Sequence, residues 1–151
     1  IMLVLLMIIG GCAGSTSGGI KVMRLGIIMK YAHREVFKLV HPHALKSIKW
    51  DMQTVQPDVL QSVLGFAIFY AVILLLGSLA MGMLGVELVT SVTSVITCTG
   101  NVGPGLASVG PMGNFAHIPQ AGKVILTFCM LAGRLEIYTI LVVFSPAFWT
   151  R

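Results

Sequence analysis

The stretch best equipped for chemistry is residues 86–106, where an apolar segment runs into a turn of threonine, glycine and proline. Its first dozen residues predict a helix of about 18 Å, too short to cross a bilayer, with Glu87 near the positive end. The sequence Thr-Cys-Thr-Gly-Asn-Val-Gly-Pro-Gly at 97–105 then ends the helix. Extended residues around a glycine can direct backbone carbonyls at an axis, where they replace the hydration shell of a cation. Since non-helical backbone at membrane depth survives only where it is buried or lines a wet cavity, we predict a re-entrant pore loop.

A second stretch, residues 10–19, contains five glycines and three hydroxyl residues, a composition that breaks or unwinds a helix. A phosphate-binding loop does not fit, because Ile20 separates the last glycine from Lys21 and no short strand precedes the stretch. A flexible connector is one interpretation. The apolar run before the stretch and the cationic helix after it favour another, an unwound intramembrane segment whose movement gates a permeation path.

Arg134 is the third candidate, because it lies eleven residues, about 16 Å of helix, beyond Lys123 and so close to the middle of a bilayer. An ionisable group at that depth is costly unless it is paired or hydrated, which makes function the default hypothesis. Glu136 is roughly 200° further around the helix and does not face Arg134. A structural ion pair with a part of the protein outside this chain is the alternative. Gly133 permits either a close helix contact or a bend.

Composition places these candidates in a membrane. Hydrophobic residues make up 56% of the chain, charged residues 10%, and the mean hydropathy is +0.94, whereas a soluble domain carries roughly a quarter charged residues. The cysteines Cys12, Cys98 and Cys129 are far apart and lack CxxC spacing, so we expect packing residues and neither a disulfide framework nor a zinc site. The chain opens inside an apolar run without a basic region, so we expect a missing N-terminal portion and no signal peptide.

The elements that must position these residues follow from hydropathy. Val59 to Leu84 is free of charge over 26 residues, about 39 Å of helix and ample for a hydrocarbon core of about 30 Å. Pro57 and Asp58 suit the start of that helix. We predict, in order, the end of a truncated transmembrane helix at 1–9, a helix at 20–40, a linker at 41–57, a span at 58–84, a pore helix at 86–98, a filter at 98–102, a loop at 103–119 and a span at 120–149.

Charge sets the orientation. Seven of the ten Lys and Arg residues lie between Lys21 and Lys49, which favours a cytoplasmic loop under the positive-inside rule over a nucleic-acid site. Residues 21–57 and the C-terminus, with Trp149 as an interfacial anchor, are therefore predicted to be cytoplasmic, and residues 103–119 exterior. His117 is predicted to be an exposed loop residue.

Four motifs carry a resemblance to a known family. They are Gly-Gly-Cys-Ala-Gly-Ser-Thr-Ser-Gly-Gly-Ile-Lys at 10–21, Gly-Asn-Val-Gly-Pro-Gly at 100–105, Gly-Arg-Leu-Glu-Ile-Tyr-Thr at 133–139 and Pro-Ala-Phe-Trp at 146–149. In this order and spacing the chain resembles the Trk/Ktr potassium-transporter superfamily, in particular its Trk-type membrane subunit. The resemblance implies an all-α integral membrane protein with four helix–pore-loop–helix repeats around one pore. Residues 1–40 would be the broken inner helix of the third repeat, and residues 58–151 the fourth repeat.

The resemblance also implies roles for residues. It places a filter strand at Cys98, Thr99, Gly100 and Asn101, extended by Val102, with K⁺ at Thr99, Gly100 and Asn101. Thr99 stands where the family often has an apolar residue, which leaves the preference for potassium over sodium open. The implied gate combines Arg134, as an electrostatic barrier beneath the filter, with the glycine-rich residues Gly10, Gly11, Gly14, Ser15, Thr16, Gly18 and Gly19.

The implied function is potassium uptake across the bacterial inner membrane, without a cofactor in this chain and without nucleic acid. Implied partners are the lipid bilayer, a second copy of the full-length subunit and a cytosolic nucleotide-binding regulatory ring, whose docking surface could include residues 21–49. Sodium-coupled or proton-coupled symport is the first alternative. A membrane enzyme or a non-conducting subunit is the second, and it lacks a nucleophile–base set or metal cluster in the sequence.

Overall fold

The computed structural model describes residues 2–12, 15, 18–41, 49–50 and 53–134. The predicted all-α architecture is confirmed, with one short hairpin added inside the expected linker, where Lys49 pairs with Thr54 and Trp50 with Gln53. The elements are α1 (Met2–Ile9), α2 (Val22–Val40), β1 (Lys49–Trp50), β2 (Gln53–Thr54), α3 (Pro57–Met83), α4 (Leu88–Gly100), the 3-10 turn η1 (Ala107–Val109) and α5 (Gln120–Arg134).

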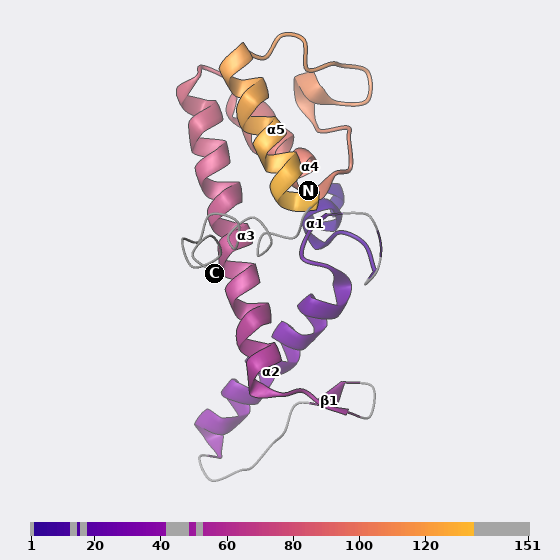
Figure 1. Cartoon of the computed structure of the whole chain (residues 1–151), viewed down its shortest axis with the longest axis vertical. Helices are drawn as coiled ribbons and strands as arrows, with labels where there is room; N and C mark the ends of the chain where they lie inside the picture. The colour runs from indigo at the N-terminus through magenta and orange to yellow at the C-terminus, as the bar shows by residue number, and fades with distance from the viewer. Residues whose placement is uncertain (1, 13–14, 16–17, 42–48, 51–52, 135–151) are drawn as a thin grey trace, which may run out of the picture.

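The chain reverses direction at α4 in the way a re-entrant loop must. Figure 1 shows α3 running most of the length of the molecule, α4 turning back along the upper half of α3, and the loop with η1 returning to the end where α4 began. From there α5 descends beside α4. The helix α4 therefore begins, and its return loop ends, at the same end of the molecule. Its 13 residues stop partway down, beside α1.

The core lies where α3, α4 and α5 meet. Small residues bring the helices close, since Gly77 of α3 has no room for a side chain between Val95 of α4 and Cys129 of α5. Cys98 and Cys129 are buried here, as expected for packing residues, whereas Cys12, for which we expected the same, is exposed. The buried cluster comprises Met81, Val95, Cys98, Val109, Ile118, Leu126 and Cys129.

Replacing Gly77 with valine is expected to destabilise the protein by about 1–3 kcal/mol, the usual cost of overpacking a core. A Cβ at Gly77 would lie 2.9 Å from Val95 Cγ1 and 3.5 Å from Cys129 Sγ. Gly82, in the same helix, is the matched control because a Cβ there meets nothing within 4 Å. Thermal aggregation of the detergent-solubilised protein measures the effect, and equal midpoints for Gly77→Val and Gly82→Val would contradict it.

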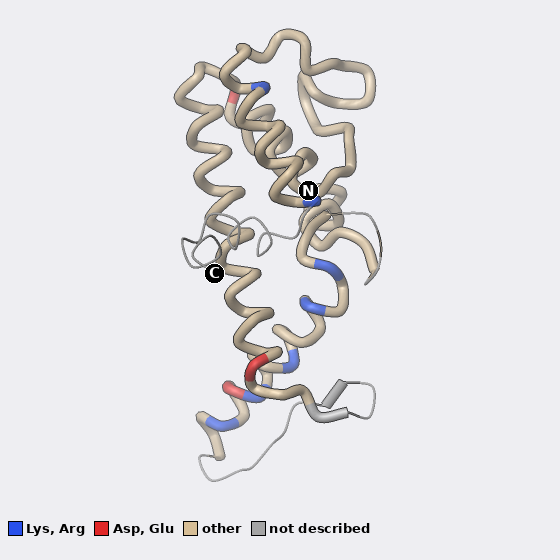
Figure 2. The backbone as a smooth tube through the Cα atoms, in the orientation of Figure 1, with Lys and Arg blue, Asp and Glu red and all other residues tan. Residues whose placement is uncertain are grey.

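The other end of the molecule is basic. In Figure 2 the cations gather along α2, away from α4 and α5, and Arg34 and Lys38 both pair with Glu35, at 2.9 and 3.6 Å. The hydrogen bond from Arg34 is the main cause that holds the pKa of the Glu35 carboxyl below its usual value. Arg24 instead lies with its guanidinium carbon 4.2 Å from the centre of the Phe66 ring, a cation–π contact that joins α2 to α3.

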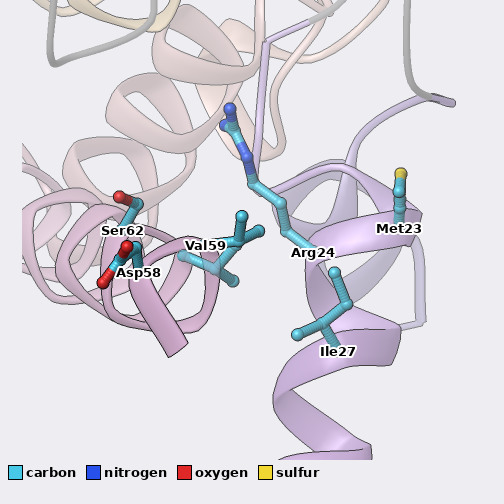
Figure 3. A pocket seen from close by; sticks show the side chains of 7 residues that line it. Met23, Arg24, Ile27, Asp58, Val59 and Ser62 are labelled. Atoms are coloured by element: carbon cyan, nitrogen blue, oxygen red, sulfur yellow. The ribbon is translucent and has the colours of Figure 1, made fainter. Parts of the chain in front are cut away.

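A cavity of about 420 Å³ opens between these two helices (Figure 3). Arg24 extends between α2 and α3 there, while Asp58 and Ser62 project from α3. Its lining is Met23, Arg24, Ile27, Asp58, Val59, Ser62 and Val63. This cavity lies between α2 and the first turns of α3, away from the end of α4.

Candidate pore-loop site

The helix α4 is rich in hydroxyl residues and is nevertheless the most buried of the described helices, since all but its first two residues and Val92 are buried. It tolerates burial because each hydroxyl has a partner, in most cases a carbonyl of the preceding turn. These bonds are Ser91 to Val86 (3.0 Å), Thr93 to Val89 (2.7 Å), Ser94 to Ser91 (2.9 Å), Thr97 to Ser94 (3.1 Å) and Thr99 to Val95 (2.8 Å). These bonds allow a helix rich in polar side chains to be buried, because each of the five hydroxyl groups has a partner.

The end of α4 differs from the sequence prediction. We predicted a helix to Cys98 and an extended filter at 98–102, whereas the helix continues to Gly100 and ends at Asn101, whose backbone is left-handed (φ 52°, ψ 39°). Asparagine tolerates this conformation and is a common helix cap. Asn101 caps the helix at this point, since its amide donates to the Cys98 carbonyl at 3.2 Å. The Val102 amide donates to the Thr97 carbonyl at 3.0 Å, so the chain turns sharply back towards its entry side.

The glycine-rich stretch at 10–19 lies between α1 and α2, which are connected by backbone hydrogen bonds. The amides of Ile20 and Lys21 donate to the carbonyls of Ile8 and Ile9, at 3.2 and 2.9 Å, so α1 and α2 are joined directly and the segment between them is looped out. Gly10 and Gly19 have φ of 74° and 91°, which glycine alone adopts without strain. Of the predicted gate residues, Gly14 and Thr16 lie outside the described residues, and Ser15 is exposed.

The looped-out segment and the end of α4 touch. The Gly18 amide donates to the Gly100 carbonyl at 3.1 Å, and a Cβ at Gly18 would overlap the Thr99 carbonyl oxygen. On the other helix, the backbone of Gly133 lies against the same Thr99 oxygen. The structure therefore brings together Gly18 of the predicted gate, Thr99 and Gly100 of the predicted filter, and α5.

Arg134 follows Gly133 directly and is the last residue of α5. Its side chain is exposed within the described chain, next to the position where α5 contacts Thr99. Glu136 and Trp149 lie outside the described residues, as does the second half of the span predicted at 120–149. We expected Gly133 to permit either a close helix contact or a bend. The structure shows the close contact, with Thr99 of α4.

Sequence reasoning missed two features of this site. Asn101 Nδ2 donates to the Met130 carbonyl of α5 at 3.3 Å, and Thr93 contacts the return loop at Leu106. Asn101 belongs to the motif at 100–105, but that motif does not indicate a bond to α5, and no motif marks Thr93. Both contacts depend on the tertiary fold. The hydroxyl-rich composition of α4 was the available signal that buried hydrogen bonds were to be expected.

Comparison with known proteins decides the family. All 151 residues match the family model described as TrkH, cation transport protein. The chain belongs to the TrkH family. A Trk system potassium uptake protein TrkH from Salmonella typhimurium is 43% identical over 141 residues, 93% of this chain and 29% of that protein. TrkI of the Trk system of Halomonas elongata is 37% identical over 144 residues, 95% of this chain and 29% of that protein.

A solved TrkH structure shares the fold. The crystal structure of the potassium transporter TrkH from Vibrio parahaemolyticus matches 98% of this chain and 31% of its own, with a TM-score of 0.88 and 36% identity. The predicted superfamily and the membrane fold are therefore confirmed. The chain spans about 29% of the length of the curated TrkH relatives it matches. Within the described residues, α3 is long and apolar enough to cross a membrane.

Proposed function

We propose that this chain provides one wall of a potassium uptake pore, with K⁺ coordinated by the backbone oxygens of Thr99, Gly100 and Asn101. The re-entrant course of α4 is the observation that carries the proposal. The helix enters and its loop leaves at one end of the molecule, and its carbonyl end lies partway down, beside the broken inner helix. The last carbonyls of a helix carry a partial negative charge, which favours a cation there. Sister repeats of the full-length polypeptide would supply the other walls.

The hydrogen bond between the Gly18 amide and the Gly100 carbonyl supports a gate. A carbonyl that accepts the Gly18 amide has less capacity to coordinate an ion, so the bond from Gly18 to Gly100 fits a closed path. Withdrawal of the looped-out segment frees that oxygen. The gate comprises Arg134 and the residues Gly10, Gly11, Gly14, Ser15, Thr16, Gly18 and Gly19.

Charge supports the orientation. The basic residues of α2 lie at the end of the molecule remote from the entry of α4, so residues 21–57 and the C-terminus are cytoplasmic and residues 103–119 exterior. A membrane potential then drives K⁺ inward with about 2.3 kcal/mol per 100 mV. The full-length subunit works as a homodimer in the bacterial inner membrane, regulated by a cytosolic nucleotide-binding ring.

Rubidium uptake tests the function. Cells that lack their own potassium uptake systems and express the full-length transporter are expected to take up rubidium with or without external sodium, and to lose uptake when a protonophore collapses the membrane potential. A strict requirement for sodium would replace the uniport proposal with symport. Well-expressed protein without any uptake would refute both.

Arg134→Ala is expected to raise basal potassium flux roughly two- to tenfold, the range for removing one positive charge from a path of intermediate dielectric. Arg134→Lys keeps the charge and is the matched control, expected to stay near the parental flux. Flux into proteoliposomes measures both. An unchanged or lower flux in a well-expressed Arg134→Ala protein would leave Arg134 with a structural role.

A further inference from the structure

Two hydroxyl contacts tie the return loop to the first half of α4. The Thr93 hydroxyl donates to Val89 within the helix, accepts the Leu106 amide at 3.4 Å and lies 3.4 Å from the Leu106 carbonyl. One turn earlier, Thr90 Oγ1 and Ser108 Oγ are 2.9 Å apart. Both threonines are buried, with exposed fractions of 5% and 0%. The loop is thus attached to α4 from the inside of the protein.

The attached part of the loop is itself closed. The Gly105 amide donates to the Val109 carbonyl at 2.7 Å. A Cβ at Gly105 would lie 2.7 Å from Val109 Cγ2 and 3.6 Å from Thr93 Oγ1. Residues 105–109 therefore form a tight turn that packs against Thr93 and cannot shift without breaking these contacts.

The lower end of the loop is attached separately. The Asn101 and Val102 amides donate to the carbonyls of Cys98 and Thr97, at 3.2 and 3.0 Å. Between the two attachments, Val102, Gly103 and Pro104 are exposed within the described chain. The conformation of this short bridge is set by the distance between its two anchors, one at the end of α4 and one at Thr93.

We propose that Thr93, assisted by the Thr90–Ser108 contact, is a positioning residue for ion selectivity. This inference rests on the proposed function, since residues 101–104 then lead out of the filter. A filter distinguishes potassium from sodium by the number and spacing of its oxygens. Release of the upper anchor lets the bridge relax, so the oxygens of the filter next to it can close around the smaller ion. Sodium is then admitted while the path itself stays open.

Thr93→Val tests the proposal because valine keeps the shape and removes the hydroxyl. In proteoliposomes that contain the full-length transporter, the sodium-to-potassium permeability ratio is expected to rise roughly two- to tenfold, the range for losing one neutral hydrogen bond. Thr93→Ser keeps the hydroxyl and is expected to stay within about twofold of the parent. Ser108→Ala removes the second contact at an exposed residue, is therefore expected to fold, and should raise the ratio less.

Thr127→Val is the matched control, because within the described part of the chain the Thr127 hydroxyl bonds to its own helix, at the Lys123 carbonyl, at 2.8 Å. An unchanged permeability ratio in both Thr93→Val and Ser108→Ala would overturn the proposal. So would an equal change in Thr127→Val. Absence of potassium flux in the parental protein would instead refute the proposed function, so the two failures are distinct.

Discussion

Gly133→Val is expected to abolish rubidium uptake by the full-length transporter. The backbone of Gly133 already touches the Thr99 carbonyl oxygen, and a Cβ there would also lie 2.7 Å from the Thr99 carbonyl carbon and 3.1 Å from its Cα. These are backbone atoms in the last turn of a buried helix, so they cannot rotate away as a side chain does. Either α5 separates from α4 or Thr99 is displaced, and each outcome removes the predicted coordination site.

The measurement is the initial rate of rubidium uptake, normalised to the amount of transporter in the membrane. We expect a loss of roughly a hundredfold or more, because displacing a functional geometry by about an ångström has an effect of that size. Gly82→Val is the control for introducing valine at a helix glycine without neighbours. Gly133→Ala, the smallest change, is expected to lower uptake less than valine. Parental uptake by Gly133→Val would show that α5 does not approach α4 as described.

Gly18→Ala is expected to have the opposite effect and raise basal flux. Its Cβ would overlap the Thr99 carbonyl oxygen and lie 3.2 Å from the Asn101 side-chain nitrogen. Gly133 is part of α5, whereas Gly18 lies outside the helices, so we expect Gly18 to move away from Thr99 and to lose its bond to Gly100. Under the proposed gate, loss of that bond favours the open state, by roughly tenfold if the bond and the overlap together contribute about 1.4 kcal/mol.

Single-channel or proteoliposome flux in the absence of regulatory ligands measures this basal activity. Gly82→Ala controls for the change of residue type, because nothing surrounds that position. Flux through Gly18→Ala at or below the parental level, with normal protein in the membrane, would show that the contact between Gly18 and Gly100 does not restrict the path.

Most of the fold was accessible from hydropathy. The span expected at 58–84 corresponds to α3 at Pro57–Met83, and the helix expected at 20–40 corresponds to α2 at Val22–Val40. These signals are strong because a long uncharged run and a change from apolar to cationic residues both follow from the solvent on each side of a membrane. The hairpin of β1 and β2 was not predicted, since each strand has only two residues and carries no measurable periodicity.

The site was predicted less completely. Glycine content located the break at 10–19 and placed the end of the pore helix at Cys98, two residues before Gly100, the last residue of α4, because glycine and proline act on the backbone locally. The sequence did not predict the exact end of α4, because that end depends on the left-handed cap at Asn101 and on the bond from the Val102 amide to the Thr97 carbonyl. Contacts such as Thr93 with Leu106 join residues 13 positions apart and depend on the path of the loop. The roles of Cys98 to Val102 in coordination stay predictions.

The direct junction between α1 and α2 has a consequence for how the family can vary. Because the Ile20 and Lys21 amides already take the carbonyls of Ile8 and Ile9, the number of residues between Ile9 and Ile20 does not set the spacing of the two helices. Insertions or deletions there are expected to alter how Gly18 meets the end of α4 while α1 and α2 stay joined. Under the proposed gate, basal flux is then expected to change independently of protein stability.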